Sequence, residues 1–139
     1  MIMTADGAVM DVIQEGHGPD LVLLHSLLTD RTVFDGIVPA LAGRRRLTLP
    51  NLPGFGASAP AGPRIEDYAD RIAALLDALA LPAATDVVAM SFGGFVGIAL
   101  ARVTARASAA SCWWTPPPRF PSRRRSRCGA WPSGRCATA

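Results

Sequence analysis

Short apolar runs alternate with amphipathic stretches over the first hundred residues of the chain. The apolar runs at residues 8–13, 21–25, 46–49 and 85–90 have the length and composition of β-strands. The run at 21–25 is apolar up to its final histidine, as expected of a strand that is buried on both faces. The pattern therefore predicts strands that are separated by longer connecting segments.

Amphipathic helices are predicted between these strands. Apolar side chains recur every three or four residues over 65–81, with acidic residues mostly on the opposite face, and Pro82 follows. Shorter helices are predicted over 32–41 and from Ser91 to about Arg102. Strands that alternate with helices indicate βα units, so we expect an α/β fold with a mostly parallel sheet flanked by helices.

The pattern ends near Ala101, and no lasting periodicity follows. Consecutive prolines at 116–118 exclude helix and central strand, and residues 123–127 are arginines interrupted by a single serine. We therefore predict the N-terminal part of an α/β domain over residues 1–102. Over residues 103–139 we predict an irregular or disordered tail that is rich in arginine, proline and tryptophan.

The formal net charge of +3 is the sum of two opposed parts. Residues 1–86 hold all 11 acidic residues but six arginines, a net charge of −5, whereas residues 87–139 hold eight arginines and no acid. The three cysteines also lie in the tail, without a C-x-x-C pair or a nearby histidine. We therefore expect neither a metal site nor a disulfide framework.

The sequence shows no membrane or export signal. No run reaches the roughly 18 apolar residues that a membrane span needs. Residues 1–12 contain no basic residue and no long apolar stretch, unlike a secretory signal. We therefore expect a cytoplasmic protein that has no membrane partner, and the sequence leaves the oligomeric state open.

Candidate chemistry lies where the apolar strand at 85–90 meets the next helix. Ser91 follows this strand, with Ala89 before it and Gly93 and Gly94 after it. A nucleophile elbow needs this arrangement, because small neighbours let other backbone pass close to a serine held in a strained turn. The helix N-terminus beneath the serine favours developing negative charge. Taken alone, the pattern equally fits a serine that only caps a helix in a βα unit.

Two earlier segments extend this pattern. The strand at 21–25 ends in His25, which Ser26 follows, and residues 51–58 contain a P-G-x-G-x-S loop. The order of the three segments resembles that of the α/β-hydrolase family over residues 8–101. The resemblance is to the esterase, lactonase and C–C hydrolase branches, without a choice among them.

The resemblance implies a role for each of these residues. The backbone N–H groups of Leu27 and Phe92 would hold an oxyanion, while His25 shapes a turn and is not the catalytic base. Ser26 and Ala89 each stand where the family has glycine. The implied function is the hydrolysis of an ester, thioester or lactone through an acyl-enzyme. The substrate would be a small ester-like molecule, and no metal or organic cofactor is implied.

The resemblance also requires an acid and a histidine after the nucleophile. No Asp, Glu or His follows Ser91 in this chain, and His17 and His25 both precede it. The loss of triad members costs about 10⁴–10⁶ in rate. We therefore expect the chain as it stands to be a catalytically dead fragment, with serine hydrolysis as the function of its family.

The tail suggests a cause for the missing residues. When the codons of residues 111–115 are read out of register, they encode an apolar residue followed by Leu-Val-Asp, as the next strand of such a hydrolase would. We therefore hypothesise a frameshift near residues 101–104 that replaced the sixth strand, the lid and the remaining triad residues. Resequencing the locus tests this hypothesis, and an unbroken reading frame shared by close relatives would contradict it.

The arginine-rich tail leaves a binding function as an alternative. Residues 123–127 could contact phosphates, and Trp113, Trp114 and Trp131 could stack on bases. However, the sequence contains no recognisable nucleic-acid-binding fold, and residues 1–86 are net negative. We therefore disfavour a nucleic-acid or acidic-surface partner.

Overall fold

The computed structural model describes residues 1–104 of the chain, in which strands and helices alternate. The elements are β1 (Ile2–Ala5), β2 (Ala8–Gly16), β3 (Asp20–Leu24), η1 (Arg31–Phe34), α1 (Val38–Leu41), β4 (Arg46–Pro50), α2 (Ile65–Ala78), β5 (Asp86–Ala89) and α3 (Phe92–Thr104). The arginine-mediated binding, the out-of-register segment at 111–115 and residues 105–139 of the predicted tail lie outside this described part. The structure does describe the hypothesised frameshift position at 101–104 and the first two residues of the predicted tail. Those two residues are helical, because α3 continues to Thr104.

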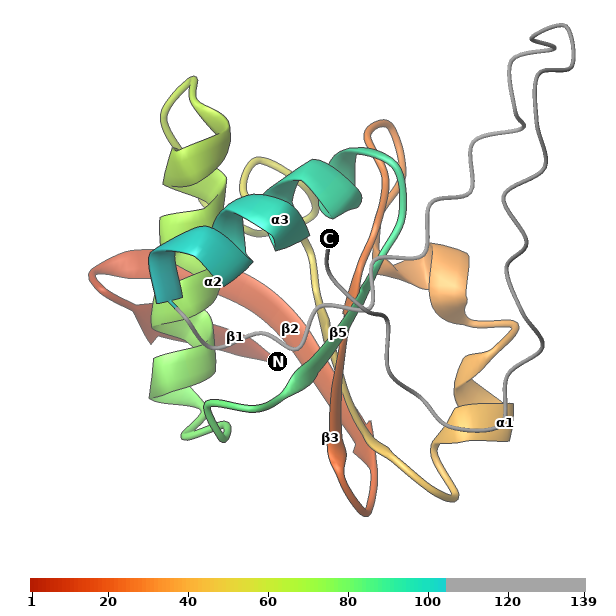
Figure 1. The fold of residues 1–139 in the computed structure, drawn as a ribbon. Helices are drawn as coiled ribbons and strands as arrows, with labels where there is room; N and C mark the ends of the chain where they lie inside the picture. Colours follow the sequence, from red (N-terminus) through yellow and green to blue (C-terminus); the bar gives the residue numbers. More distant parts are fainter. Residues whose placement is uncertain (105–139) are drawn as a thin grey trace, which may run out of the picture.

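The strands form one sheet in the order β1-β2-β4-β3-β5 (Figure 1). β3 is parallel to both β4 and β5, whereas β2 is antiparallel to β1 and to β4. Leu24 at the end of β3 pairs with Ala89 at the end of β5. The carboxyl ends of these two strands therefore meet at one edge of the sheet, which is where parallel α/β sheets carry their sites.

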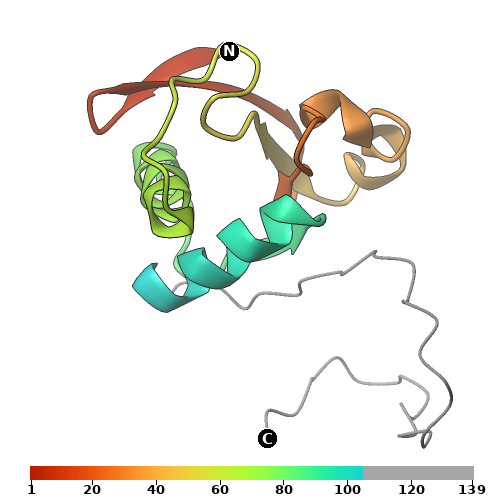
Figure 2. The same ribbon diagram turned by 90° about the horizontal axis from the view of Figure 1, so that it is seen from above.

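Helices cover both faces of the sheet (Figure 2). α2 and α3 pack on one face, where their apolar sides join a core that contains Leu24, Leu75 and Val96. η1 and α1 lie on the other face, where Phe34 and Val38 pack against residues of β3 and β4. Because the central strands are buried on both faces, their side chains are apolar in succession. The predicted α/β architecture is confirmed.

β1 was not expected from the hydrophobic pattern, although a local signal for it exists. Asp6 and Gly7 have φ angles of 45° and 70° and connect β1 to β2 as a tight hairpin turn. An Asp-Gly pair between two strands is one of the strongest hairpin signals, because both turn residues need positive φ. β1 therefore pairs with β2 at the edge of the sheet.

The prediction of a single helix over residues 32–41 is wrong. This segment forms the 3-10 helix η1 and the separate short helix α1. Gly36 lies between them, and Pro39 occupies the first turn of α1. Proline has no N–H to donate within a helix but fits its first turn, so a new helix begins there. The apolar spacing is the same in both cases, which is why the periodicity alone misses the break.

The long helix is present as predicted, but it ends at Ala78 and not at Leu81. Ala80 has a φ of 51°, the N–H of Ala80 donates to the carbonyl of Asp77, and the N–H of Leu81 donates to the carbonyl of Leu76. These two bonds form a Schellman motif, which reverses the chain before Pro82. None of the helices in residues 1–104 is long and apolar enough to cross a lipid bilayer.

Candidate active site

Ser91 lies at the sharp turn between β5 and α3 and has a φ of 48°. A positive φ is rare for a residue with a side chain and stores strain of about 1–3 kcal/mol. The turn is closed by the N–H of Gly93, which donates to the carbonyl of Met90 at 2.9 Å, and by that of Gly94, which donates to the carbonyl of Ser91 at 2.8 Å. Ser91 therefore precedes the helix and does not lie within it.

The backbone around this turn is packed too closely for larger residues. A Cβ atom on Gly93 would lie 2.5 Å from the carbonyl oxygen of His25 and 2.6 Å from that of Leu24. Ala89 is buried and faces Gly97 of α3, where an added Cβ would meet the Ala89 Cβ at 3.5 Å. A side chain on Gly94, in contrast, would meet no atom within 4 Å. Gly93 and Ala89 therefore let α3 approach the strands.

The loop after β3, residues 25–30, lies beside this turn (Figure 1). The N–H of Met90 donates to the carbonyl of Leu24 at 2.9 Å, which joins the last residue before the loop to the last residue before Ser91. The close approach of Gly93 to His25 gives a second contact. The fold thus brings together the two segments that the sequence singled out.

Two backbone N–H groups of these segments remain available. Within residues 1–104, the N–H groups of Leu27 and Phe92 donate to no protein acceptor. Phe92 is the first residue of α3, so its N–H belongs to the free N-terminal end of the helix, where the macrodipole is positive. Leu27 is half exposed in the loop. Free N–H groups of this kind can bind a developing negative charge.

Ser26 turns its carbonyl inward, and two side chains hold it. The Nδ1–H of His25 donates to the Ser26 oxygen at 2.8 Å, and the hydroxyl of Thr29 donates to the same oxygen at 2.8 Å. These two bonds fix the backbone at Ser26, which stands where the resemblance expects glycine.

His25 is completely buried, and its ring is occupied by the backbone. Its Nε2 accepts from the N–H of Leu52 at 2.9 Å, so the proton of the neutral ring lies on Nδ1 and is donated to Ser26. The ring also packs edge-on against Phe55 at 5.0 Å. Burial lowers the pKa of His25 below its ordinary value near 6.5, against the opposing effects of the Ser26 carbonyl and of Asp30. This histidine connects two loops and has no ring nitrogen left for a proton transfer.

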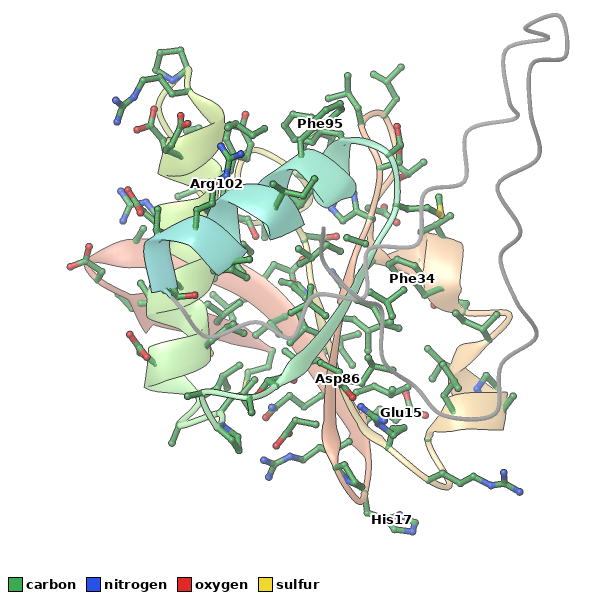
Figure 3. All side chains as sticks on the ribbon, in the orientation of Figure 1. Glu15, His17, Phe34, Asp86, Phe95 and Arg102 are labelled. Carbon is green, nitrogen blue, oxygen red and sulfur yellow. The ribbon has the colours of Figure 1, made fainter. Side chains whose placement is uncertain are left out.

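His17 lies in the connection between β2 and β3, at the opposite end of the sheet from the N-terminal part of α3 that carries Phe95 (Figure 3). Its backbone N–H donates to the carbonyl of Ala42. Neither histidine of the chain is therefore placed to act as the base for Ser91.

A network of polar side chains holds the far end of the 25–30 loop. It joins Asn51 and Ser58 of the 51–58 segment to Asp11 and Arg31, which the sequence did not single out. Asp11 accepts from the Arg31 Nη1 at 2.6 Å and from the Asn51 Nδ2 at 2.8 Å. The Asn51 Oδ1 in turn accepts from the backbone N–H of Arg31 at 2.9 Å. The hydroxyl of Ser58 accepts from the N–H of Asp11 and donates to the carbonyl of Asn51. The network joins β2, η1 and the 51–58 loop.

The network leaves no room for a side chain at position 56 and keeps Asp11 ionised. A Cβ on Gly56, which has a φ of 54°, would lie 2.1 Å from the Asn51 Nδ2. Burial by itself raises the pKa of Asp11, but the hydrogen bonds from Asn51 and Arg31 outweigh it and hold the pKa below its ordinary value. Asp11 is therefore a buried carboxylate that stays ionised.

Two hollows adjoin the site. One, of about 340 Å³, is a mainly apolar groove between α2 and α3, and the other, of about 630 Å³, is open and lies beside the 25–30 loop. The apolar groove is lined by Ile65, Glu66, Phe92, Phe95, Ile98, Ala99, Arg102 and Val103. The open hollow is lined by Leu28, Thr29, Asp30, Thr32, Val33, Phe55 and Gly56. Phe92, the residue after Ser91, lines the first hollow, and Leu28 and Thr29 of the 25–30 loop line the second. Residues 1–104 contain no group of three or more His, Cys, Asp or Glu that could hold a metal ion.

Known proteins are similar to this chain in both sequence and fold. A family model described as "alpha/beta hydrolase fold" matches residues 19–112. Pimeloyl-[acyl-carrier protein] methyl ester esterase from Aeromonas hydrophila is 44% identical over 89 residues, which are 62% of this chain and 33% of that protein. The esterase of the same name from Aromatoleum aromaticum is 34% identical over 120 residues, 86% of this chain and 46% of that protein. A thermophilic esterase from Thermogutta terrifontis superposes with a TM-score of 0.72 at 28% identity, covering 81% of this chain and 44% of that structure.

The matched region thus spans 33% and 46% of the length of these two curated relatives. The predicted resemblance to the N-terminal half of a hydrolase is confirmed, because the match covers most of this chain but less than half of each relative. The chain belongs to the alpha/beta hydrolase fold family.

Proposed function

We propose that this chain carries the nucleophile and the oxyanion hole of a serine hydrolase that acts on ester-type bonds. The observation that carries the proposal is the positive φ of Ser91 at the turn from β5 into α3. A strained turn of this kind holds a serine hydroxyl clear of the backbone at the end of the sheet. The free N–H groups of Leu27 and Phe92 support the same assignment.

The proposed reaction is acyl transfer in two steps. The Ser91 Oγ attacks the carbonyl carbon of the ester, and the carbonyl oxygen becomes an oxyanion held by the N–H groups of Leu27 and Phe92. The tetrahedral intermediate then expels the alcohol and leaves an acyl-enzyme, which a water molecule hydrolyses to the acid. Solvent takes the Ser91 proton, because the ring nitrogens of His25 are occupied and His17 lies at the far end of the sheet.

The absence of an Asp, Glu or His after Ser91 sets the expected rate. Enzymes that lack their triad retain about 10³–10⁴-fold catalysis over water, which comes from the oxyanion hole and from binding. In place of the complete inactivity expected from the sequence, we therefore propose slow turnover for this chain, far below the rate of a complete serine hydrolase. The free N–H groups of Leu27 and Phe92 support this change.

The proposed substrate is a carboxylic ester with an apolar acyl part, a choice that the apolar groove beside Phe92 supports. The curated relatives are named as esterases of a methyl ester carried by an acyl carrier protein. An acyl-carrier-protein methyl ester is therefore a second candidate, whereas thioesters and lactones follow only from the family chemistry.

The hydrolysis of p-nitrophenyl butyrate by the wild-type chain and by Ser91→Ala tests the proposal. We expect a small excess rate in the wild type that is lost in the variant, because the alanine has no nucleophile. Equal rates in the two proteins would contradict the proposal and leave a catalytically dead member of the family.

A further inference from the structure

We propose that Thr29 is a positioning residue that aims the Leu27 N–H at the oxyanion, an inference that rests on the proposed function. The Thr29 hydroxyl donates to the carbonyl oxygen of Ser26 at 2.8 Å. This carbonyl belongs to the same peptide group as the N–H of Leu27. Thr29 therefore acts on the oxyanion hole through the peptide plane and has no contact of its own with the reacting atoms.

The geometry of the peptide bond carries this argument. A trans peptide is planar, and its C=O and N–H point in opposite directions. When the Ser26 carbonyl is fixed toward Thr29 and His25, the Leu27 N–H must point away from both side chains. A rotation of this plane would turn the N–H away from its present direction. The two hydrogen bonds to the Ser26 oxygen thus determine where the Leu27 N–H points.

The loop needs such bonds because its conformation is strained. Leu28 has a φ of 63°, and the residue is 91% exposed. The left-handed conformation costs a leucine about 1–2 kcal/mol, and a side chain so exposed recovers little of this by burial. The hydroxyl of Thr29 spans Leu28 and bonds Ser26, so it stabilises the strained residue directly.

Both ends of the loop are held by other residues, and in its middle Thr29 shares the Ser26 carbonyl with His25. His25 bonds the N–H of Leu52 at the start of the loop, and Arg31 bonds Asn51 and Asp11 just beyond its end. The loss of the Thr29 hydroxyl should therefore loosen the residues between these two anchors without unfolding the domain.

The test compares Thr29→Val, which removes the hydroxyl but keeps the shape, with Thr29→Ser, which keeps the hydroxyl. Thr85→Val is the matched control, because the Thr85 hydroxyl also donates to the carbonyl three residues earlier, that of Pro82, but at the start of β5. Two readouts are measured on the full chain. They are the ¹⁵N relaxation order parameter of the Leu27 amide and the Ser91-dependent hydrolysis of p-nitrophenyl butyrate.

In Thr29→Val we expect the Leu27 order parameter to fall from about 0.85 toward 0.6, the values of rigid and flexible backbone. The amides of β4 and α2 should keep their wild-type values, and Thr29→Ser and Thr85→Val should both resemble the wild type. We expect kcat to fall by about tenfold with KM unchanged, less than the 10²–10³ for the loss of a whole oxyanion-hole donor.

An unchanged Leu27 order parameter in folded Thr29→Val would overturn the inference, as would a Thr29→Ser variant as mobile as Thr29→Val. If the wild type hydrolyses the ester no faster than Ser91→Ala, the proposed function fails. The order parameter still decides in that case whether Thr29 fixes the Ser26–Leu27 peptide. The two failures are therefore distinguishable.

Discussion

The positions of the residues around Ser91 can be predicted from the sequence, but several of their side-chain contacts cannot. The sequence places His25 and Ser91 just after apolar strands and Gly93 in the first turn of the following helix, because these positions follow from the strand and helix pattern. It does not predict that Asp11 and Arg31 would meet, since they come from separate elements and no motif joins them. The register of β2 against β4, which a single sequence does not specify, sets Asp11 beside Asn51, and Asn51 in turn bonds the N–H of Arg31.

The Asp11–Asn51 pair allows a charge-exchange test at this scale. Asp11→Asn removes the carboxylate that bonds Arg31 and Asn51, and we expect a loss of about 2 kcal/mol in the free energy of unfolding. Asn51→Asp places two carboxylates at one site and should also destabilise the fold. The double variant restores one amide and one carboxylate beside Arg31.

Urea unfolding of the four proteins measures this coupling. We expect the double variant to lie within about 1 kcal/mol of the wild type, the sign of a direct interaction in a double-mutant cycle. Asp20→Asn is the control, since it breaks the more exposed pair with Arg46 at the start of β3 and β4. If the effects of the two single substitutions simply add, the network does not stabilise the loop as described.

His25 makes the stability depend on pH. The fold lowers the pKa of His25 below its ordinary value near 6.5, mainly by burial. The unfolded chain therefore binds a proton more readily, so the contribution is complete above pH 6.5 and is lost as the pH falls toward the pKa of the folded state. We expect the free energy of unfolding to decrease below about pH 6.5.

Urea titrations between pH 5 and 8 test this slope. His25→Asn should reduce the slope whatever its effect on stability at pH 8, and His17→Asn should keep it. A slope that survives in His25→Asn and disappears in His17→Asn would show that His25 is not the group responsible.

At the scale of single elements, the hydrophobic pattern predicted most helices and strands. It missed strand β1 and the break between η1 and α1, which depend on turn residues and on a proline. The Asp6–Gly7 turn defines the β1–β2 hairpin, while Pro39 divides the segment that periodicity assigned to one helix. The hydrophobic period reports which face is buried and not where the backbone breaks. The missed and divided elements are therefore those in which turn chemistry outweighs periodicity.

The left-handed conformation of Ala80 just after α2 allows a test of stability. Ala80 is exposed and occupies the left-handed position of the Schellman motif, where glycine has no steric cost. We expect Ala80→Gly to increase the free energy of unfolding by about 1 kcal/mol and to raise the Tm by roughly 4–8 °C.

Ala78→Gly is the matched control, because Ala78 is also exposed but lies within the last helical turn. There the same change should cost about 0.5–1 kcal/mol. Thermal unfolding followed by circular dichroism measures both variants. Destabilisation by Ala80→Gly comparable to that by Ala78→Gly would show that position 80 has no left-handed strain to relieve.

At the scale of the whole molecule, the sheet order brings the site together from segments far apart in the sequence. Leu24 and Ala89 pair across β3 and β5, so the 25–30 loop and the Ser91 turn share one edge (Figure 1). This juxtaposition was expected from the resemblance to the α/β-hydrolase family, whereas the two hollows beside it could not be predicted. Their shapes depend on how α2, α3 and the loops pack, which apolar spacing does not specify.

The whole molecule also determines how the site should react. Ser91 precedes α3 next to a free N–H, while the ring nitrogens of His25 are hydrogen-bonded and His17 lies at the far end of the sheet. The folded chain should therefore make one serine more reactive than the others without making it as fast as in a complete triad.

Covalent labelling of the folded chain with a fluorophosphonate, followed by peptide mapping, tests whether the fold activates Ser91. The tetrahedral adduct places an oxygen where the oxyanion would lie, so we expect the label on Ser91, faster than in urea-unfolded protein and absent from Ser91→Ala. Labelling of Ser91 no faster in the folded than in the unfolded chain would contradict the claim that the fold activates this serine.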